Sequence, residues 1–241
     1  MILIPMMGKS SRFYDAGYTK PKFMLPIGKS TLFKETVLSF KDYIETDYFI
    51  FTIPNDNKIH QWICGQLQNI NLKNYKIVTL DNETNGQADT IFQTIKRIKM
   101  HDDELNIFNI DTVLLNFNKK FEGRNNCDGY IEVFIGEGDH WSFAEIDEDK
   151  YIIRTAEKVR ISAYCSNGFY NFKSKEIFIE GFLKQKEFNT LNKAGEIYIA
   201  PIYNFLINEG YSFKVKEVDI QDIIFSGTPS EYETMLSSYK I

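Results

Sequence analysis

The sequence has few cysteines and few histidines, and neither residue type is clustered. Its three cysteines, Cys64, Cys127 and Cys165, are far apart and form no Cys-x-x-Cys pair. An odd number of widely spaced cysteines is unsuited to a disulfide framework or a zinc site, so we expect reduced thiols in a cytoplasmic protein. The three histidines also lack the spacing of a metal site.

Long hydrophobic runs are absent as well. No stretch approaches the roughly 18 apolar residues that a membrane-spanning helix needs. The first seven residues are apolar, but Gly8, Lys9 and Ser10 follow them, without the small-residue cleavage site of a signal peptide. The sequence therefore predicts neither a membrane protein nor an exported one, and a cytoplasmic location is expected.

The chain as a whole has no excess of positive charge. Its 28 Lys and Arg residues face 33 Asp and Glu residues, and the net charge of −5 disfavours general binding to nucleic acid. The first 34 residues are an exception, because they carry a net charge of +5 and leave −10 to the remainder. The charged residues of this segment are Lys9, Arg12, Asp15, Lys20, Lys22, Lys29 and Lys34.

Aromatic and aliphatic residues, by contrast, are plentiful and recur in strand and helix patterns. The 20 Phe and 14 Tyr residues require a large core. Helical apolar stripes follow Ser30, begin again at Ile59 and follow Gly86. Continuous apolar runs, typical of strands buried on both faces, cover 2–5, 48–53, 75–80 and 105–110. This alternation predicts a parallel sheet with helices on both faces.

The pattern changes after Asp111. Strands are predicted at 129–135, 141–146, 151–155, 168–172 and 211–218, with helices after Ser174 and over 199–207. The turn 147–150 indicates a hairpin, and we interpret its Asp-x-Asp pattern as a solvated turn rather than a metal motif. Since no linker or repeat interrupts the chain, we expect one α/β domain over 1–241, with halves 1–111 and 112–241.

Several common site motifs are excluded. The two Gly-Lys-Ser tripeptides, at Gly8 and Gly28, lack the earlier glycine of a phosphate-binding P-loop. Gly136 and Gly138 lack the third glycine and the following helix of a dinucleotide-binding fingerprint. No Gly-x-Ser-x-Gly sequence supports nucleophilic hydrolase chemistry.

The loop after the first strand is a candidate anion site. Gly8 permits a tight turn and close backbone approach, so free N–H groups can face a ligand. Arg12 offers a fixed fork of donors for phosphate oxygens, and Lys22 a compact mobile charge. In an open α/β sheet such a loop lies at the carboxyl ends of the strands, where ligands bind. From spacing alone, a solvated surface loop remains equally open.

Longer motifs give a resemblance to a known family. The segments 4–13 (IPMMGKSSRF) and 17–29 (GYTKPKFMLPIGK) resemble the nucleotidylyltransferase, or sugar-1-phosphate pyrophosphorylase, family. They are most similar to a branch from capsule and surface-polysaccharide pathways. Matching blocks follow in family order at 85–88, 109–111, 141–145, 156–158, 167–173, 200–204 and 227–229. The resemblance implies a three-layer, Rossmann-like (GT-A-like) fold with a mostly parallel mixed sheet and a smaller β-rich acceptor-binding half.

The resemblance also implies a nucleotide site in the first half. The backbone of the Gly8 loop would hold a nucleoside triphosphate, with Arg12 on its β- and γ-phosphates and Lys22 between the α-phosphate and the incoming phosphate. Gly86 would pack its backbone against the nucleobase, where a side chain would clash. The implied nucleotide-binding residues are Met6, Met7, Gly8, Lys9, Ser10, Ser11, Asn85, Gly86 and Gln87.

Acceptor and metal residues are implied in the same way. Asp111 would bind Mg²⁺ at the α-phosphate, since oxygen ligands suit this cation. The implied acceptor-binding residues are Glu145, Glu157, Lys158, Asn167 and Gly168. We also expect the segment 112–140, Trp141 and the loop 185–197 to shape the acceptor pocket. Family members often carry a second metal carboxylate where this chain has Phe225, so that ligand is uncertain and Asp222 is a candidate substitute.

The resemblance thus implies an enzyme that couples a nucleoside triphosphate to a phosphorylated acceptor and releases pyrophosphate. Arg12, Lys22 and Asp111 would carry the reaction, and CTP, UTP or dTTP is expected rather than ATP or GTP. No nucleic-acid or membrane partner is expected, and a homodimer is left open. Two alternatives are a GT-A-type glycosyltransferase that uses a nucleotide sugar, and a non-catalytic nucleotide-binding homologue, which the Phe225 departure would explain.

Overall fold

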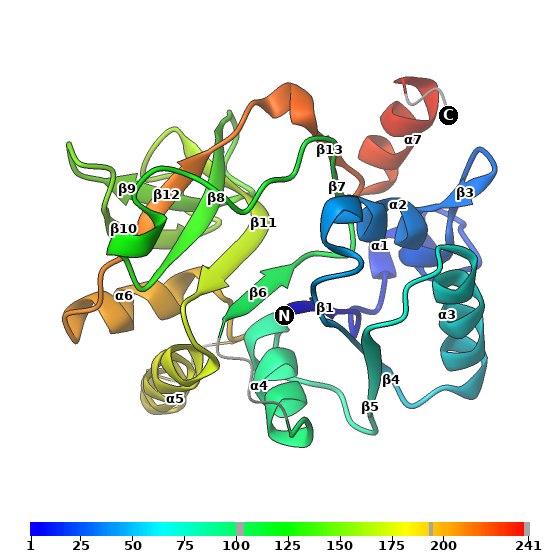
Figure 1. Cartoon of the computed structure of the whole chain (residues 1–241), viewed down its shortest axis with the longest axis horizontal. Coiled ribbons are helices and arrows are strands. Elements are labelled where there is room, and N and C mark those ends of the chain that lie inside the picture. The colour runs from blue at the N-terminus through cyan, green and yellow to red at the C-terminus, as the bar shows by residue number, and fades with distance from the viewer. Residues whose placement is uncertain (100–103, 193–194, 239–241) are drawn as a thin grey trace.

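Strands from both halves of the chain form one central sheet in the computed structural model, which describes residues 1–99, 104–192 and 195–238 (Figure 1). The strands are β1 (Ile2–Pro5), β2 (Pro26–Ile27), β3 (Ser30–Thr31), β4 (Phe49–Pro54), β5 (Tyr75–Leu80), β6 (Leu105–Phe108), β7 (Thr112–Leu114), β8 (Gly129–Ile135), β9 (Ser142–Ile146), β10 (Ile152–Glu157), β11 (Tyr164–Phe172), β12 (Lys214–Glu217) and β13 (Ile223–Phe225). The helices are α1 (Ser11–Asp15), α2 (Leu32–Leu38), α3 (Asn57–Asn69), α4 (Gln87–Arg97), α5 (Lys175–Asn192), α6 (Ala200–Asn208) and α7 (Pro229–Ser238).

The sheet is mixed but has a parallel centre. In the described residues it has nine strands: the path β10-β9-β11-β6-β1-β4-β5, with β8 paired to β11 and β12 to β8. Leu3 of β1 lies opposite Ile50 of β4 and Ile107 of β6, and all these pairings are parallel. β11 runs antiparallel to β6, β8 and β9. This arrangement confirms the predicted α/β class with a mostly parallel mixed sheet.

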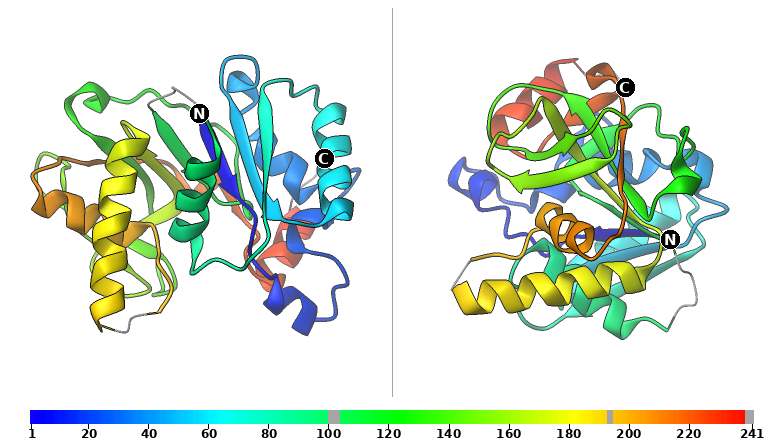
Figure 2. Two further views of the ribbon diagram at one scale, coloured as in Figure 1. Left: turned by 90° about the horizontal axis from the view of Figure 1, so that it is seen from below. Right: turned by 90° about the vertical axis from the view of Figure 1, so that its left-hand side faces the viewer.

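Helices cover both faces of the sheet and make three layers (Figure 2). Alternate residues of β1 point to opposite faces. Leu3 therefore packs in the core under α4, α5 and α6, whereas Ile2 and Ile4 pack under α2 and α3. Figure 2 shows α4 and α5 side by side on one face.

The order of the strands reverses beside β1. The chain passes from β1 to β4 and β5 on one side, and then places β6 on the other side of β1. In open α/β sheets a crevice for ligands forms at such a reversal, outside the carboxyl ends of the strands. The loops that follow β1 and β6 lie at this position.

The segment 6–29, expected to be a long loop, contains more structure than its composition indicates. Helix α1 and a short 3-10 turn at Lys22–Met24 form within it. Phe13 is buried against Tyr18 and against Tyr232 of α7, which supplies the apolar contact that the segment alone lacks. Helix α7 and the short pair β7–β13 have no counterpart in the sequence prediction.

Two other local predictions are settled by hydrogen bonds. The helix predicted after Ser30 begins one residue later, because Thr31 Oγ1 accepts from the Lys34 backbone N–H and caps α2. The turn between β9 and β10 is solvated, as predicted: Asp147 Oδ1 accepts from the backbone of Asp149 and of Tyr151.

All three cysteines are free thiols. No helix among the described residues is both long and apolar enough to cross a membrane.

Candidate active site

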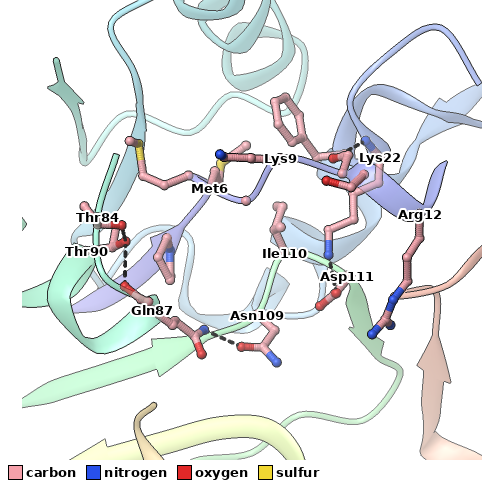
Figure 3. A pocket seen from close by; sticks show the side chains of 18 of the residues that line it. Met6, Lys9, Arg12, Lys22, Thr84, Gln87, Thr90, Asn109, Ile110 and Asp111 are labelled. Atoms are coloured by element: carbon pink, nitrogen blue, oxygen red, sulfur yellow. Dashed lines mark hydrogen bonds and ion pairs between the residues drawn. The ribbon is translucent and has the colours of Figure 1, made fainter. Parts of the chain in front are cut away.

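A cavity of about 560 Å³ opens where the strand order reverses (Figure 3). The loop after β1, the loop after β6 and the start of α4 form its walls. Its lining includes Pro5, Met6, Met7, Gly8, Lys9, Ser10, Ser11, Arg12, Phe13, Lys22, Phe23, Glu83, Thr84, Gly86, Gln87, Thr90, Asn109, Ile110, Asp111, Glu196 and Gly227. All the residues implied for the nucleotide site lie here except Asn85. We call this space the first cavity.

The loop after β1 presents an open backbone surface to the first cavity. A Cβ atom added at Gly8 would meet nothing within 4 Å, so no internal packing demands a glycine there. Ser10 adopts a left-handed conformation, with φ of 55°, and its Oγ accepts from the Lys22 backbone N–H at 3.1 Å. Lys9 forms an ion pair with Glu83, in the segment between β5 and α4, with Nζ 2.7 Å from Oε1. These contacts tie Lys9 and Ser10 to neighbouring segments, whereas the space beside Gly8 is open.

Lys22 and Asp111 meet at one side of the first cavity. Lys22 Nζ forms an ion pair with Asp111 Oδ2, and both side chains are mostly buried (Figure 3). Asp111 comes shortly after β6, which ends at Phe108 rather than at the predicted residue 110. Asn109, between the strand and Asp111, accepts at Oδ1 from Gln87 Nε2 at 2.6 Å (Figure 3).

Gly86 lines the first cavity, and the protein's own packing requires a glycine at this position. Its φ is 97°, and an added Cβ would lie 2.7 Å from the carbonyl oxygen of Ile197 and 2.8 Å from its nitrogen. The same segment is bonded on both sides, by Ile197 N–H to Asn85 O and by Ala88 N–H to Ile197 O. Close packing against Ile197 therefore excludes a side chain at Gly86, and contact of its backbone with a nucleobase stays a prediction. Asn85 lies on the flank of the cavity and donates its backbone N–H to Asp89.

A second cavity, of about 190 Å³, joins the first. Both are lined by Arg12, Asn109, Asp111 and Gly227. The second cavity is lined further by Thr112, His140, Trp141, Ser142, Glu157, Ser166, Asn167, Gly168, Tyr170, Phe225, Thr228 and Glu231. One carboxylate, that of Asp111, therefore faces two adjoining spaces.

Three of the five predicted acceptor residues, Glu157, Asn167 and Gly168, line the second cavity. Gly168 has φ of 91°, and an added Cβ would lie 2.4 Å from Asn109 Nδ2, so glycine lets β11 approach the loop after β6. Asn167 donates from Nδ2 to Glu132 Oε2 at 2.9 Å and accepts at Oδ1 from the Phe169 backbone. Glu132 is buried and paired with Lys216, and burial raises its pKa against the opposing effect of that lysine.

The other two predicted acceptor residues lie outside both cavities. Glu145 pairs with Arg154 Nη2 at 2.9 Å, on the face of β9 opposite to Ser142, because strand residues alternate in direction. Lys158 Nζ is 3.2 Å from the Tyr198 hydroxyl and 4.6 Å from the centre of its ring. Its distance to Glu157 Oε1 is 3.9 Å.

Glu157 ends a chain of hydrogen bonds that sequence reasoning did not find. Tyr170 Oη donates to Ser142 Oγ at 3.0 Å, and Ser142 Oγ donates to Glu157 Oε2 at 2.5 Å. Burial raises the pKa of Glu157, opposed by the Ser142 hydrogen bond and by Lys158. Burial also raises the pKa of Tyr170 to about 12, which keeps its hydroxyl a donor. In the sequence, the only signal for this chain of hydrogen bonds is the position of Ser142 within the matching block 141–145.

Two further residues outside the prediction, Gly227 and Glu231, flank Asp111. A Cβ added at Gly227 would lie 3.0 Å from Asp111 Oδ2 and 3.5 Å from Glu231 Oε2. Glu231 also caps α7, since its Oε2 accepts from the Thr228 backbone at 2.9 Å. This capping pattern is readable from the sequence as Thr228-x-x-Glu231.

The donor set at Asp111 fits a magnesium ion that is shared with phosphate oxygens. Mg²⁺ is commonly held by one or two carboxylates together with substrate phosphates. Among the described residues no group of three or more His, Cys, Asp or Glu side chains could hold a metal alone. Asp222 accepts from Asn116 Nδ2 at 2.7 Å and lines neither cavity. Phe225 packs on Trp141 and Phe134 instead of offering a ligand.

The segments expected to shape the acceptor pocket contribute unequally. Thr112, His140 and Trp141 line the second cavity. From the loop 185–197, residues 185–192 belong to α5 and Glu196 lines the first cavity, while 193 and 194 lie outside the described residues.

Comparison with solved structures finds close similarity over the whole chain. A nucleoside-diphosphate-sugar pyrophosphorylase from Vibrio cholerae RC9 is 37% identical, with a TM-score of 0.94 over 99% of this chain and 100% of that one. Two others are similar in fold: an inositol-1-phosphate CTP transferase from T. maritima and a CTP:phosphocholine cytidylyltransferase from Streptococcus pneumoniae. The first is 12% identical with a TM-score of 0.74 over 100% of this chain and 97% of that one. The second is 11% identical with a TM-score of 0.73 over 99% and 98%. Neither a model of a protein family nor a curated protein matches the sequence.

Proposed function

Because the chain belongs to the nucleotidyltransferase family that includes nucleoside-diphosphate-sugar pyrophosphorylases, we propose that it joins a nucleoside triphosphate to a phosphorylated acceptor and releases pyrophosphate. The triphosphate occupies the first cavity and the acceptor the second. The main support for this proposal is that the two cavities adjoin at Asp111. Arg12 also lines both cavities, and Lys22 forms an ion pair with Asp111. A transferase of this kind needs two anions side by side, and this is where the chain gathers charged side chains.

In the proposed reaction, an oxygen of the acceptor phosphate attacks the α-phosphorus of the triphosphate. A new P–O bond forms as the bond between the α-phosphorus and the bridging oxygen breaks, and pyrophosphate leaves with that electron pair. The attacking oxygen is already an anion, so no general base is required. The work of the protein is to hold the reactants in line and to neutralise charge in the transition state.

Arg12 and Lys22 supply positive charge to the reacting phosphates. Arg12 has a planar fork that can bind two phosphate oxygens, and the Lys22 ammonium can follow the α-phosphate as its charge changes. Lys22 then leaves its contact with Asp111. Asp111 would hold Mg²⁺, which supplies further positive charge at the phosphates when bound. The open backbone at Gly8 allows the triphosphate to approach the loop N–H groups.

A pyrimidine nucleotide and a role in surface polysaccharide complete the proposal. Support for both comes from the resemblance of the segment 4–13 to the capsule-pathway branch of the family. The product would be an activated precursor, made from a sugar phosphate or another small phosphorylated compound.

The test is a two-stage screen of the wild-type enzyme. Thermal stability is measured with each of ATP, GTP, CTP and UTP or dTTP in the presence of Mg²⁺, and pyrophosphate release is then measured with a panel of phosphorylated acceptors. We expect a pyrimidine triphosphate to stabilise the protein most and at least one acceptor to give Mg²⁺-dependent pyrophosphate. Nucleotide binding with no pyrophosphate from any acceptor would contradict the proposal and favour a non-catalytic homologue.

A further inference from the structure

Strand β11 departs from regular pairing where it lines the second cavity. Where β8 has the single residue Glu132, β11 has the three residues 167–169, which we call the β11 bulge. Bulges re-aim side chains and are frequent next to active sites. Two residues of the bulge, Asn167 and Gly168, line the second cavity together with the preceding Ser166. What fixes the bulge therefore fixes a wall of this cavity.

Side-chain acceptors bind the backbone of the β11 bulge. The N–H of Gly168 donates to Ser166 Oγ at 3.1 Å, and the N–H of Phe169 donates to Asn167 Oδ1 at 3.0 Å. A buried backbone N–H without an acceptor is costly, so these bonds stabilise the bulged conformation. The second bond requires that the oxygen of the Asn167 amide, and not its nitrogen, face the backbone.

Glu132 sets that orientation from the opposite strand. Its Oε2 accepts from Asn167 Nδ2 at 2.9 Å, which leaves Asn167 Oδ1 for the Phe169 backbone. Its other oxygen, Oε1, accepts from Nζ of Lys216 at 2.6 Å, and Lys216 lies opposite Glu132 in the pairing of β12 with β8. The carboxylate thus accepts from two donors, one at each oxygen.

The chemistry of residue 132 matters more here than the attraction between its charge and that of Lys216. The side chains of Glu132 and Lys216 are 2% and 11% exposed, and a buried ion pair adds little net stability because desolvation offsets the attraction. A carboxylate has no donor, so it can face Lys216 Nζ and Asn167 Nδ2 together. A glutamine has one oxygen and one NH₂ group, and would turn a donor toward one of these two donors.

We propose that Glu132, which lines neither cavity, is a positioning residue of the acceptor site. It orients the amide of Asn167 and thereby fixes the wall 166–168 against which the acceptor binds. This inference rests on the proposed function, because it concerns the acceptor of that reaction. The attacking phosphate oxygen must lie in line with the α-phosphorus, and a displacement of about 1 Å can cost about 10²-fold in rate. Residues 166–168 do not line the first cavity, so triphosphate binding is independent of Glu132.

The experiment compares two double variants that both lack the buried charges. Glu132→Gln/Lys216→Met keeps an oxygen for Asn167 Nδ2, and without the lysine no second donor competes for that oxygen. Glu132→Met/Lys216→Met has the same charge and a similar volume but offers Asn167 no acceptor. Replacement of a buried ion pair by neutral side chains of similar volume is often neutral for stability, so both variants should fold.

Kinetics with respect to the acceptor are measured at saturating triphosphate and Mg²⁺. The acceptor is the compound most active with wild type in a panel that includes glucose 1-phosphate, inositol 1-phosphate and phosphocholine. The variant with glutamine should keep an acceptor KM within about threefold of wild type, whereas the variant with two methionines should raise it about tenfold or more. In both variants the Kd of the triphosphate should stay within about twofold of wild type, since the first cavity is unchanged.

Asp47→Asn is the matched control for the loss of a buried ion pair. Asp47 is paired with Lys119, the two side chains are 13% and 9% exposed, and neither residue lines the first or the second cavity. This variant should lower the melting temperature and leave the acceptor KM as in wild type. The comparison separates an effect on the acceptor site from a general loss of stability.

Equal acceptor KM values for the two double variants would overturn this inference. An equal loss of triphosphate and acceptor affinity in Glu132→Met/Lys216→Met would overturn it too, because the pair would then support the whole structure rather than the acceptor site. Either result would leave the proposed function standing. Absence of pyrophosphate from wild type with every acceptor would instead remove the proposed function, and this inference with it.

Discussion

Lys22 and Asp111, 89 residues apart in the sequence, form an ion pair on the wall of the first cavity. In the proposed reaction the lysine would bind phosphate oxygens and the aspartate a metal ion. Their pairing keeps both side chains in place and keeps either charge from being left alone in a mostly buried position. Binding of a metal-bound triphosphate would exchange these partners.

The first prediction concerns Lys22. Lys22→Ala should lower kcat by about 10²–10³-fold, because losing one charged contact to a transition state typically costs that much. The Kd of the triphosphate should change far less, since Arg12 and the loop backbone remain. Single-turnover pyrophosphate release and nucleotide titration measure the two effects separately. A variant with near-wild-type turnover would remove Lys22 from the reaction.

The second prediction concerns the metal. Asp111→Asn should abolish the extra thermal stabilisation that Mg²⁺ adds to a bound triphosphate, because the carboxylate facing both cavities is lost. Asp222→Asn is the control. Its side chain is bonded to Asn116 and lines neither cavity, so the Mg²⁺ response should remain. If Asp222→Asn removed the response and Asp111→Asn did not, the metal would have to be reassigned.

The sequence predicts the parallel half of the fold well, because buried parallel strands are continuous apolar runs. The predicted run 75–80 matches β5 at both ends. The sequence-based prediction fails where contacts between residues far apart in the sequence determine the structure. Helix α1 forms because Phe13 is buried by a residue of α7, and neither segment shows this alone. β6 stops at Phe108, which frees Asn109 and Asp111 to line the cavities.

The sequence also predicts which residues gather at the two cavities where they are close together in the chain, and fails where they are distant. Loop residues close together in sequence, such as Gly8 and Arg12, were identified by their motif and lie in one cavity. The hydrogen bonds that join Tyr170, Ser142 and Glu157 bring together three strands, so only the fold reveals them. Glu145 was selected from a matching block, yet strand alternation turns it to the other face.

The third prediction contrasts two glycines. Gly86→Ala should destabilise the protein by about 2–4 kcal/mol, since it places a Cβ at positive φ and against the Ile197 backbone. Gly8→Ala should leave the unfolding free energy within about 0.5 kcal/mol, because its Cβ would point into open space. It should nevertheless weaken triphosphate binding, as the methyl group would occupy the cavity. Chemical denaturation and nucleotide titration of both variants provide the measurements.

The last prediction follows from the pKa of Glu157, which burial raises above that of an exposed glutamate. An acid with a raised pKa holds more protons in the folded state than in the unfolded state between its two pKa values. Its ionisation therefore lowers stability as pH rises through that interval. Wild type should lose stability relative to Glu157→Gln as pH rises from about 4.5, the unfolded pKa, through the higher folded pKa. Chemical denaturation of both proteins across pH 4 to 8 gives the two stability curves. Parallel curves for the two proteins would show that Glu157 does not titrate in this range.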